Sequence, residues 1–329
     1  MKIALLQEIN SIRKLFSDSS LNDLKSLGEV SICEKENKID QYAVKNFIKN
    51  SDILITSWGS PKLEREILED ACNLKLVIHA AGSVKGIITP YFLDRGIQIT
   101  SAAEVLGRGV AETALGMTIA SLKNMWLLSK NLHEGEWSKG GDNVKDLFDI
   151  KVGVVGAGRA GKHYIRLMKN FDVDILLHDP FISIEAANEL GVVKAELEQL
   201  LQTSDIVSIH APSIPATYKM FNKEKLALMK DGAILINTAR GSIIDEEALI
   251  DELKSGRLFA CLDVFDPEPP AVDHPFRSFD NVVLTPHIAG CCNNGLHRIG
   301  KFCIEEIKRF LIGQKLEGEV KVEKLDELA

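Results

Sequence analysis

The chain has 329 residues, of which 45% are hydrophobic and 26% are charged, and its formal net charge at pH 7 is −8. This length and composition are typical of a globular protein with two domains, each large enough for its own core. The negative charge argues against nucleic acid or an anionic membrane as a partner, and no apolar run approaches the ~20 residues of a membrane span.

The N-terminal segment and the cysteines predict a cytoplasmic protein. Residues 1–15 carry the polar pair Gln7-Glu8 where a signal peptide would have an apolar core. The cysteines show no CxxC or zinc-ligand spacing, which predicts reduced thiols and no metal site. They are Cys33, Cys72, Cys261, Cys291, Cys292 and Cys303. The adjacent pair Cys291-Cys292 invites the hypothesis of a redox switch, and the alternative is two packing thiols.

Five short apolar runs occupy the first hundred residues, with amphipathic stretches between several of them. They are Ile3–Leu6, Glu29–Ile32, Ile53–Ile55, Leu76–Ile78 and Gly96–Ile99. Strands that alternate with helices predict a small parallel α/β domain. The loops 56–61 and 80–84 follow two of these strands, and their small residues leave backbone N–H groups open to an anion. Each could equally be an ordinary turn.

The next stretch predicts a long helix followed by a long loop. Glu104–Leu128 is apolar with many small residues, which indicates one helix that packs closely against its surroundings. Residues 131–149 are polar and loop-like around Trp137. A loop of this length is typical of a functional segment or of an arm onto a partner subunit.

Residues 152–179 have the pattern of a dinucleotide-binding unit: an apolar run, a glycine turn, a helix, a second apolar run and an acid. Gly156 allows the tight turn, Gly158 lets the backbone approach a pyrophosphate, and Gly161 lets the helix pack on the strand. The phosphates would meet the N-terminus of the helix. Asp179 is placed to accept hydrogen bonds from a ribose diol.

Further strands follow at Ile206–Ile209, Ala233–Ile236, Leu258–Val264 and Val282–Leu284, so that six strands complete a doubly wound sheet. Asp245 is a candidate N-cap for a helix at Glu246–Leu253. A helical stripe runs from Leu296 to Phe310, and residues 317–329 are expected to form a loose tail.

The predicted fold is therefore α/β with two parallel-sheet domains. Residues 1–101 with 287–329 would form a flavodoxin-like substrate domain, and residues 102–286 a Rossmann domain for the cofactor. The cleft between the domains is the expected active site.

Candidate chemical groups follow four predicted strands. His210-Ala211-Pro212 turns the chain near the cofactor, and His210 is expected to line the adenosine pocket rather than to act as a base. Arg240 has the planar donors that suit a carboxylate, although a surface ion pair is the alternative. Asp263 would need a nicotinamide carboxamide or a backbone N–H as partner if it is buried.

Glu268 lies in a proline-flanked turn, and His287 follows the last strand after Pro286. Reduction of a 2-keto acid needs a hydride and a proton for the carbonyl oxygen. Histidine is a suitable general acid, a carboxylate on its other nitrogen fixes the tautomer, and an arginine polarises the carbonyl.

At this point the chain resembles the D-isomer-specific 2-hydroxyacid dehydrogenases, which include glyoxylate/hydroxypyruvate reductases and phosphoglycerate dehydrogenases. The resemblance covers almost the whole length. It rests on GAGRAG at 156–161 with HDP at 178–180, HAP at 210–212, NTARG at 237–241, DVFDPEP at 263–269 and TPHIAG at 285–290.

The resemblance implies roles for these residues. The catalytic set would be Arg240, Glu268 and His287, with Glu268 as the partner of the proton donor His287. The cofactor NAD would lie on Gly156, Gly158, Arg159, Ala160, Gly161, Asp179, His210, Pro212, Thr238, Ala239 and Asp263. The amides of Gly82 and Ser83, with Arg240, would bind the substrate carboxylate. A homodimer through the cofactor domain is also implied.

Departures from the family pattern leave the substrate open. Lys85-Gly86 stand where many members have an acidic residue followed by a polar one. Thr113 stands where many members have a histidine. Glu268 argues against formate chemistry, and a phosphoglycerate dehydrogenase of the long type, with a regulatory domain after residue 329, is not expected. The charge of Asp179 predicts NADH over NADPH. The alternative function is an NADH-binding, corepressor-like protein of the same fold.

Overall fold

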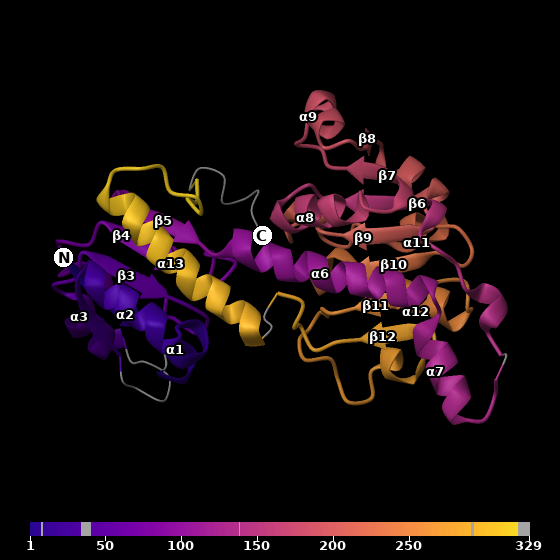
Figure 1. Cartoon of the computed structure of the whole chain (residues 1–329), viewed down its shortest axis with the longest axis horizontal. Helices are drawn as coiled ribbons and strands as arrows, with labels where there is room; N and C mark the ends of the chain where they lie inside the picture. Colours follow the sequence, from indigo (N-terminus) through magenta and orange to yellow (C-terminus); the bar gives the residue numbers. More distant parts are fainter. Residues whose placement is uncertain (8, 34–40, 138, 291–292, 322–329) are drawn as a thin grey trace. The chain divides into compact units, whose positions relative to one another are not determined.

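The computed structural model describes residues 1–7, 9–33, 41–137, 139–290 and 293–321. It divides into two compact units (Figure 1). Unit 1 comprises Met1–Leu106 and the described residues after position 292, and unit 2 comprises Gly107–Gly290. The predicted domain boundaries lie a few residues before these two points. Each unit contains one parallel sheet, so the predicted fold class is confirmed.

Unit 1 has a five-stranded parallel sheet in the order β2-β1-β3-β4-β5, which is the flavodoxin-like order. Its elements are β1 Lys2–Leu6, α1 Ile9–Leu15, α2 Asp18–Leu27, β2 Glu29–Ile32, α3 Gln41–Ile48, β3 Ile53–Thr56, α4 Arg65–Leu68, β4 Leu76–His79, α5 Pro90–Asp94, β5 Gln98–Ser101 and α13 Leu296–Leu311. All four residues of β3 and of β4 are buried, because helices cover both faces of the sheet.

The end of the chain is held more firmly than the sequence predicts. The C-terminal helix α13 packs its apolar stripe against α1 and α2. After it, the buried carboxylate of Glu306 accepts hydrogen bonds from the main-chain N–H groups of Glu317 (3.0 Å) and Gly318 (3.1 Å). Glu319 then pairs with Thr100 of β5. The predicted loose tail is therefore wrong for residues 317–320, and residues 322–329 lie outside the described residues.

Unit 2 has a seven-stranded parallel sheet in the order β12-β11-β10-β9-β6-β7-β8. Its strands are β6 Phe148–Val155, β7 Asp172–His178, β8 Val193–Lys194, β9 Ile206–Ile209, β10 Ile234–Asn237, β11 Phe259–Leu262 and β12 Val282–Leu284. Six of them are the predicted doubly wound complement. The two-residue strand β8 is a seventh that the sequence analysis missed.

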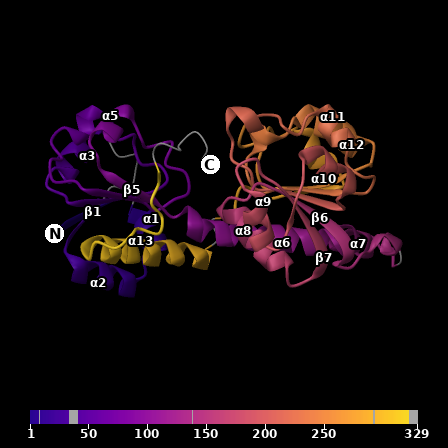
Figure 2. The same ribbon diagram turned by 90° about the horizontal axis from the view of Figure 1, so that it is seen from above.

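Helices cover both faces of this sheet (Figure 2). They are α6 Ala103–Leu122, α7 Met125–His133, α8 Arg159–Met168, α9 Ile184–Glu189, α10 Leu197–Thr203, α11 Lys223–Ala227 and α12 Glu246–Lys254. The helices α6 and α8 lie on one face and α10–α12 on the other. Alternate residues of β9 show this: Ile206 belongs to the core of the first face and Val207 to the core of the second.

The predicted single helix at 104–128 is wrong. Asn124 adopts a left-handed conformation, with φ of 49°, and separates α6 from α7. Asparagine tolerates this conformation better than most residues. The predicted loop 131–149 is shorter than expected, because α7 extends to His133 and β6 begins at Phe148. Asp245 is the N-cap residue of α12 as predicted, but its side chain makes no capping hydrogen bond.

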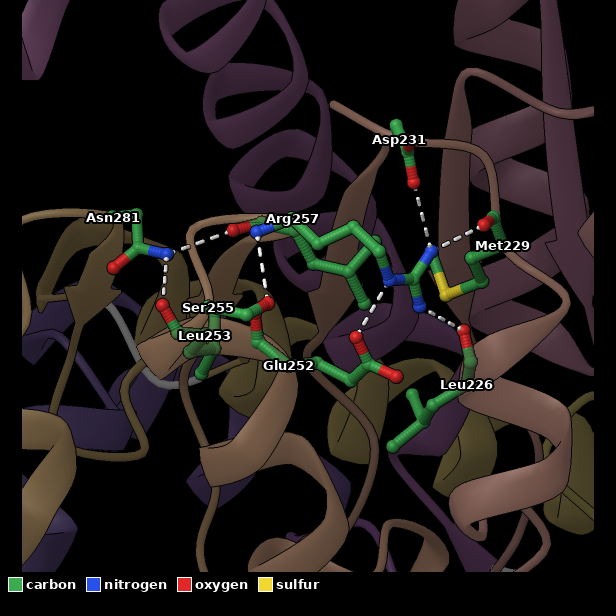
Figure 3. Close-up of polar contacts among 9 residues, drawn as sticks. Leu226, Met229, Asp231, Glu252, Leu253, Ser255, Arg257 and Asn281 are labelled. Carbon is green, nitrogen blue, oxygen red and sulfur yellow. Dashed lines mark hydrogen bonds and ion pairs between the residues drawn. The ribbon is translucent and has the colours of Figure 1, made fainter.

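Arg257 stabilises unit 2 at the start of β11 (Figure 3). Its guanidinium donates to the carbonyl oxygens of Met229 (2.5 Å) and Leu226 (2.6 Å) at the end of α11. It also donates to the carboxylate of Glu252 in α12 (2.6 Å). The side chain therefore joins two helices on the same face of the sheet. Among the described helices, none is long and apolar enough to cross a membrane.

Candidate active site

Six neighbouring strands of unit 2 place the predicted residues at one edge of the sheet. Because the strands are parallel, the segments that follow β7, β6, β9, β10, β11 and β12 meet at their carboxyl ends. These segments carry, in that order, Asp179, the glycine turn, His210, Arg240, Asp263 and His287. The sheet therefore gathers residues that are more than a hundred positions apart in the sequence.

The glycine turn is built so that two of its glycines are sterically required. Gly156 has φ of 98°, and a Cβ there would lie 2.7 Å from the main-chain nitrogen of Ala211. A Cβ on Gly161 would lie 2.0 Å from the carbonyl oxygen of Gly156. At Gly158, the N-cap of α8, no described atom lies within 4 Å of a Cβ position. This open approach to a helix N-terminus fits a pyrophosphate.

Asp179 links the end of β7 to the glycine turn. Its carboxylate accepts hydrogen bonds from the main-chain N–H groups of Ala157 (2.6 Å) and Phe181 (2.8 Å). The side chain is half-buried. Since each carboxylate oxygen has a second lone pair, the group retains acceptor capacity for a ribose diol.

Glu268 and His287 form a hydrogen-bonded pair. The Nδ1 atom of His287 lies 2.6 Å from Oε2 of Glu268. The other carboxylate oxygen of Glu268 accepts from the main-chain N–H of Phe265 (3.0 Å). Because Nδ1 is engaged with the carboxylate, Nε2 is the ring nitrogen left for a reacting molecule. The side chain of His287 is 49% exposed.

Asp263 holds the loop that carries His287. It is fully buried, and its carboxylate accepts from the hydroxyl of Thr285 (2.5 Å) and from the main-chain N–H groups of Ile288 (3.0 Å) and Ala289 (2.9 Å). Its carbonyl oxygen accepts from the N–H of His287 (2.8 Å). Of the two partners that the sequence left open for Asp263, the structure contains backbone N–H groups. A contact with a carboxamide stays a prediction.

Arg240 lies close enough to the Glu268–His287 pair to interact with the charge of Glu268. The main chain after β10 is shaped by Asn237, which accepts from the N–H of Ala239 (3.0 Å) and donates to the carbonyl oxygen of Arg240 (2.9 Å). Burial lowers the pKa of the Arg240 guanidinium, and the charge of Glu268 opposes this shift. A Cβ on Gly241 would lie 2.1 Å from the carbonyl carbon of Phe265, so only glycine allows this close packing.

Two buried polar atoms at this edge have no partner within the part of the chain that the structure describes. They are Nδ1 of His210 and the hydroxyl of Thr238. Burial lowers the pKa of His210 to about 3, so the ring is neutral and poorly suited to act as a base at neutral pH. Unpartnered atoms beside a glycine turn fit a dinucleotide that supplies the missing hydrogen bonds. Pro212 lies two residues after His210.

The predicted substrate loop belongs to unit 1. Gly82 and Ser83 follow β4 and are half-buried. The hydroxyl of Ser57 donates to the carbonyl oxygen of Ala80 (3.1 Å). The buried ring of His79 is hydrogen-bonded to the hydroxyl of Thr56 (2.9 Å). Burial lowers the pKa of His79 to about 4, and the main chain of Ser83 opposes this shift.

Several residues that shape these loops were missed in the sequence. His79 ends an apolar strand directly before a loop of small residues. This position could have identified it from the sequence as a residue that shapes the loop. Thr113 donates to the carbonyl oxygen of Ala289 (3.3 Å) from α6, and nothing in the sequence indicated that contact. Within the described residues, no group of three or more His, Cys, Asp or Glu side chains could hold a metal ion. The pair Cys291-Cys292 lies outside the described residues.

Comparisons with known proteins agree with this geometry. Residues 115–289 match the family model described as "D-isomer specific 2-hydroxyacid dehydrogenase, NAD binding domain". The chain is 34% identical to a glyoxylate reductase of Pyrococcus furiosus over 285 residues, which are 84% of each chain.

The chain is also 32% identical to a D-3-phosphoglycerate dehydrogenase of Methanocaldococcus jannaschii over 308 residues. The matched region covers 92% of this chain and 57% of that protein. The chain therefore spans about half the length of the D-3-phosphoglycerate dehydrogenases that it matches. Among solved structures, a D-2-hydroxyisocaproate dehydrogenase superposes with a TM-score of 0.81 at 25% identity, over 97% of this chain and 99% of that one.

Proposed function

The chain belongs to the D-isomer-specific 2-hydroxyacid dehydrogenase family, and from this premise we propose that it interconverts a 2-keto acid and a D-2-hydroxy acid with NAD as cofactor. The observation that carries the proposal is the hydrogen bond between Glu268 and His287, close to Arg240 at the cofactor edge of the sheet. A proton donor, its orienting carboxylate and a cation for the substrate are the groups that this reaction needs.

The residues would divide the work as follows. Bound NADH supplies the hydride. His287 gives its Nε2 proton to the carbonyl oxygen, and Glu268 keeps the ring oriented through Nδ1. Arg240 binds the substrate carboxylate and polarises the carbonyl. The main-chain N–H groups of Gly82 and Ser83 would bind the same carboxylate.

The cofactor residues follow from the turn and its neighbours. The N–H groups of Arg159 and Ala160, at the start of α8, would bind the pyrophosphate, next to the glycines Gly156, Gly158 and Gly161. Thr238 and Ala239 would contact the nicotinamide ribose. Asp179 accepts from the adenosine ribose, and its charge repels a 2′-phosphate, so NADH is the preferred reductant. A higher kcat/KM with NADPH would refute this preference.

The test is a panel of substrates with NADH oxidation as the signal. Glyoxylate, hydroxypyruvate, pyruvate, phenylpyruvate and oxaloacetate cover small, polar, aromatic and dianionic side chains. At least one should be reduced, and the His287→Ala variant should lose kcat by several orders of magnitude because no group replaces its proton. The alternative, a non-catalytic NADH-binding protein, is not favoured by the family. Tight NADH binding without turnover of any substrate would restore it.

A homodimer through unit 2 is part of the proposal. Large apolar side chains stand exposed between α7 and the start of β6: Trp126 is 43% exposed, Leu132 54%, Trp137 85% and Phe148 67%. We take residues 126–148 as the candidate interface, because burial of such side chains would stabilise a dimer. Light scattering should give twice the mass of one chain, and the double variant Trp126→Ser/Leu132→Ser should give a monomer. A wild-type monomer at micromolar concentration would refute the dimer.

We propose that the protein is cytoplasmic, because its described cysteines form no disulfide bonds with one another. The four described cysteines Cys33, Cys72, Cys261 and Cys303 are free, as expected of a reducing compartment.

A further inference from the structure

Unit 2 contains a second glutamate–histidine pair in addition to Glu268 and His287. Nε2 of His274 lies 3.2 Å from Oε2 of Glu246, which belongs to the first turn of α12. The two side chains are 17% and 19% exposed, whereas that of His287 is 49% exposed. The reaction proposed above uses neither residue of this second pair.

The ring of His274 is held in one orientation. Its Nδ1 caps the short 3₁₀ helix Pro275–Ser278 and accepts from the main-chain N–H of Phe276 (3.4 Å). The ring also packs on the buried ring of Phe276, with centroids 4.7 Å apart. Because a main-chain N–H can only donate, Nδ1 is the acceptor, and the ring proton lies on Nε2, which donates to Glu246.

Glu246 joins His274 to the turn that carries Glu268. Its Oε1 accepts from the main-chain N–H of Asp266 (3.0 Å), while its Oε2 accepts from His274. The preceding main-chain N–H, that of Phe265, donates to Glu268 (3.0 Å). Two consecutive N–H groups of this turn therefore bind one carboxylate each.

The same turn packs against the loop of Arg240, which is held separately. A Cβ on Gly241 would lie 2.6 Å from the main-chain nitrogen of Asp266. The Arg240 loop has its own hydrogen bonds to the side chain of Asn237, and these do not involve Glu246. Loss of the Glu246 contact should therefore release the turn of Glu268 and leave Arg240 in place.

We infer that Glu246 and His274 are a positioning pair, which holds the turn 265–268 so that the carboxylate of Glu268 stays directed at Nδ1 of His287. The inference rests on the proposed function, in which Glu268 orients the proton donor. The pair acts through the main chain of the turn. Its loss should lower kcat, which depends on the orientation of the proton donor, and leave KM nearly unchanged.

Steady-state kinetics of Glu246→Ala test this role. The variant removes the acceptor of the Asp266 N–H, so kcat should fall by about three- to tenfold, the effect of one hydrogen bond, at nearly unchanged KM. Glu247→Ala is the matched control, because Glu247 lies in the same first turn of α12 but is exposed. It removes the same charge and should keep the wild-type kcat. Equal kcat of the two variants overturns the inference.

Two variants of His274 test the other half of the pair. His274→Gln keeps an N–H donor near the site of Nε2 and should retain most of the kcat. His274→Phe keeps an aromatic ring on Phe276 but removes the donor, so kcat should fall by about two- to fivefold. Equal kcat of the two variants would remove His274 from the pair and overturn the inference as stated.

A double-mutant cycle separates positioning from a general loss of stability. If Glu246 acts through Glu268, Glu246→Ala should lower kcat in the wild-type background and have no further effect in the Glu268→Ala background. A merely structural role predicts the same loss in both backgrounds, and this result would contradict the inference.

Amide hydrogen exchange provides a measurement that needs no turnover. Because the N–H of Phe265 donates to Glu268, its protection reports the position of that carboxylate. Glu246→Ala should speed exchange at both Phe265 and Asp266, and faster exchange at Asp266 alone would overturn the inference. If the unmodified chain reduces no 2-keto acid, the proposed function fails, while exchange at Phe265 still decides whether the pair holds Glu268.

Discussion

The Asp263→Asn substitution tests how the His287 loop is held. The two side chains have almost the same shape, but one carboxylate oxygen becomes an NH₂ group. Oδ1 accepts from Thr285 and Ile288, and Oδ2 accepts from Ala289. Whichever oxygen is replaced, a main-chain N–H then faces a donor. The hydroxyl of Thr285 can reorient, but the N–H groups of Ile288 and Ala289 cannot.

The magnitude follows from these contacts. A buried donor without an acceptor costs about 1–3 kcal/mol, and the opposed NH₂ adds to this, so we expect a loss of roughly 2–4 kcal/mol in the free energy of unfolding. Because the same bonds fix the loop on which His287 lies, kcat should fall at least tenfold. Amide hydrogen exchange at Ile288 and Ala289 should become faster.

Urea unfolding, hydrogen exchange and single-turnover kinetics measure the three effects. Thr285→Val is the matched control, because it removes one donor and leaves both main-chain bonds in place. It should lose only about 0.5–1.5 kcal/mol. If Asp263→Asn were as stable as Thr285→Val and kept its kcat, the carboxylate would not be what holds this loop.

Three further predictions concern other parts of the molecule. Arg240→Lys should mainly raise KM, by about tenfold or more, because lysine lacks the planar pair of donors; an unchanged KM in steady-state assays would contradict this. Arg257→Ala should lower the free energy of unfolding by about 2–4 kcal/mol, whereas Lys130→Ala at an exposed ion pair should leave the free energy of unfolding almost unchanged. Stability should fall on acidification: burial lowers the pKa of His79 from 6.5 to about 4, so the unfolded chain binds a proton that the folded chain excludes. This contribution is complete above about pH 6.5, and about 3 kcal/mol of it is lost by pH 4. Urea unfolding of His79→Gln should show a flatter pH profile, and an unchanged profile would refute the assignment.

The sequence predicted the strands well because most are buried on both faces. Such strands read as continuous apolar runs, and β3, β4, β9 and β10 were found for this reason. The start of β6 was missed because Phe148 and Asp149 are exposed and do not continue the apolar run. The break at Asn124 was missed because one left-handed residue leaves the apolar composition on both sides unchanged.

The site divides in the same way. Residues at strand ends were found because parallel topology alone brings them together, and Asp179, Arg240 and His287 needed only the strand positions. Buried carboxylates that hold the main chain, in the site or elsewhere, were harder to recognise from the sequence. Glu306 reads as one charge in a polar stripe of α13, yet it is fully buried and binds main-chain N–H groups eleven and twelve residues later. Only the packed structure identifies such a carboxylate as structural.

Both units use a neutral, buried histidine next to a loop that we assign to a ligand. His79 ends β4 and is hydrogen-bonded to Thr56, and His210 follows β9 and contacts Ser208. A neutral imidazole has one donor and one acceptor, so it can join two groups of opposite character without burying a charge. The ring of His79 is held by Thr56, whereas Nδ1 of His210 has no partner within the described residues. We therefore expect His79 to shape its loop and His210 to contact the cofactor. Replacement of His79 should therefore alter stability and the position of Ser83, and replacement of His210 should alter cofactor affinity.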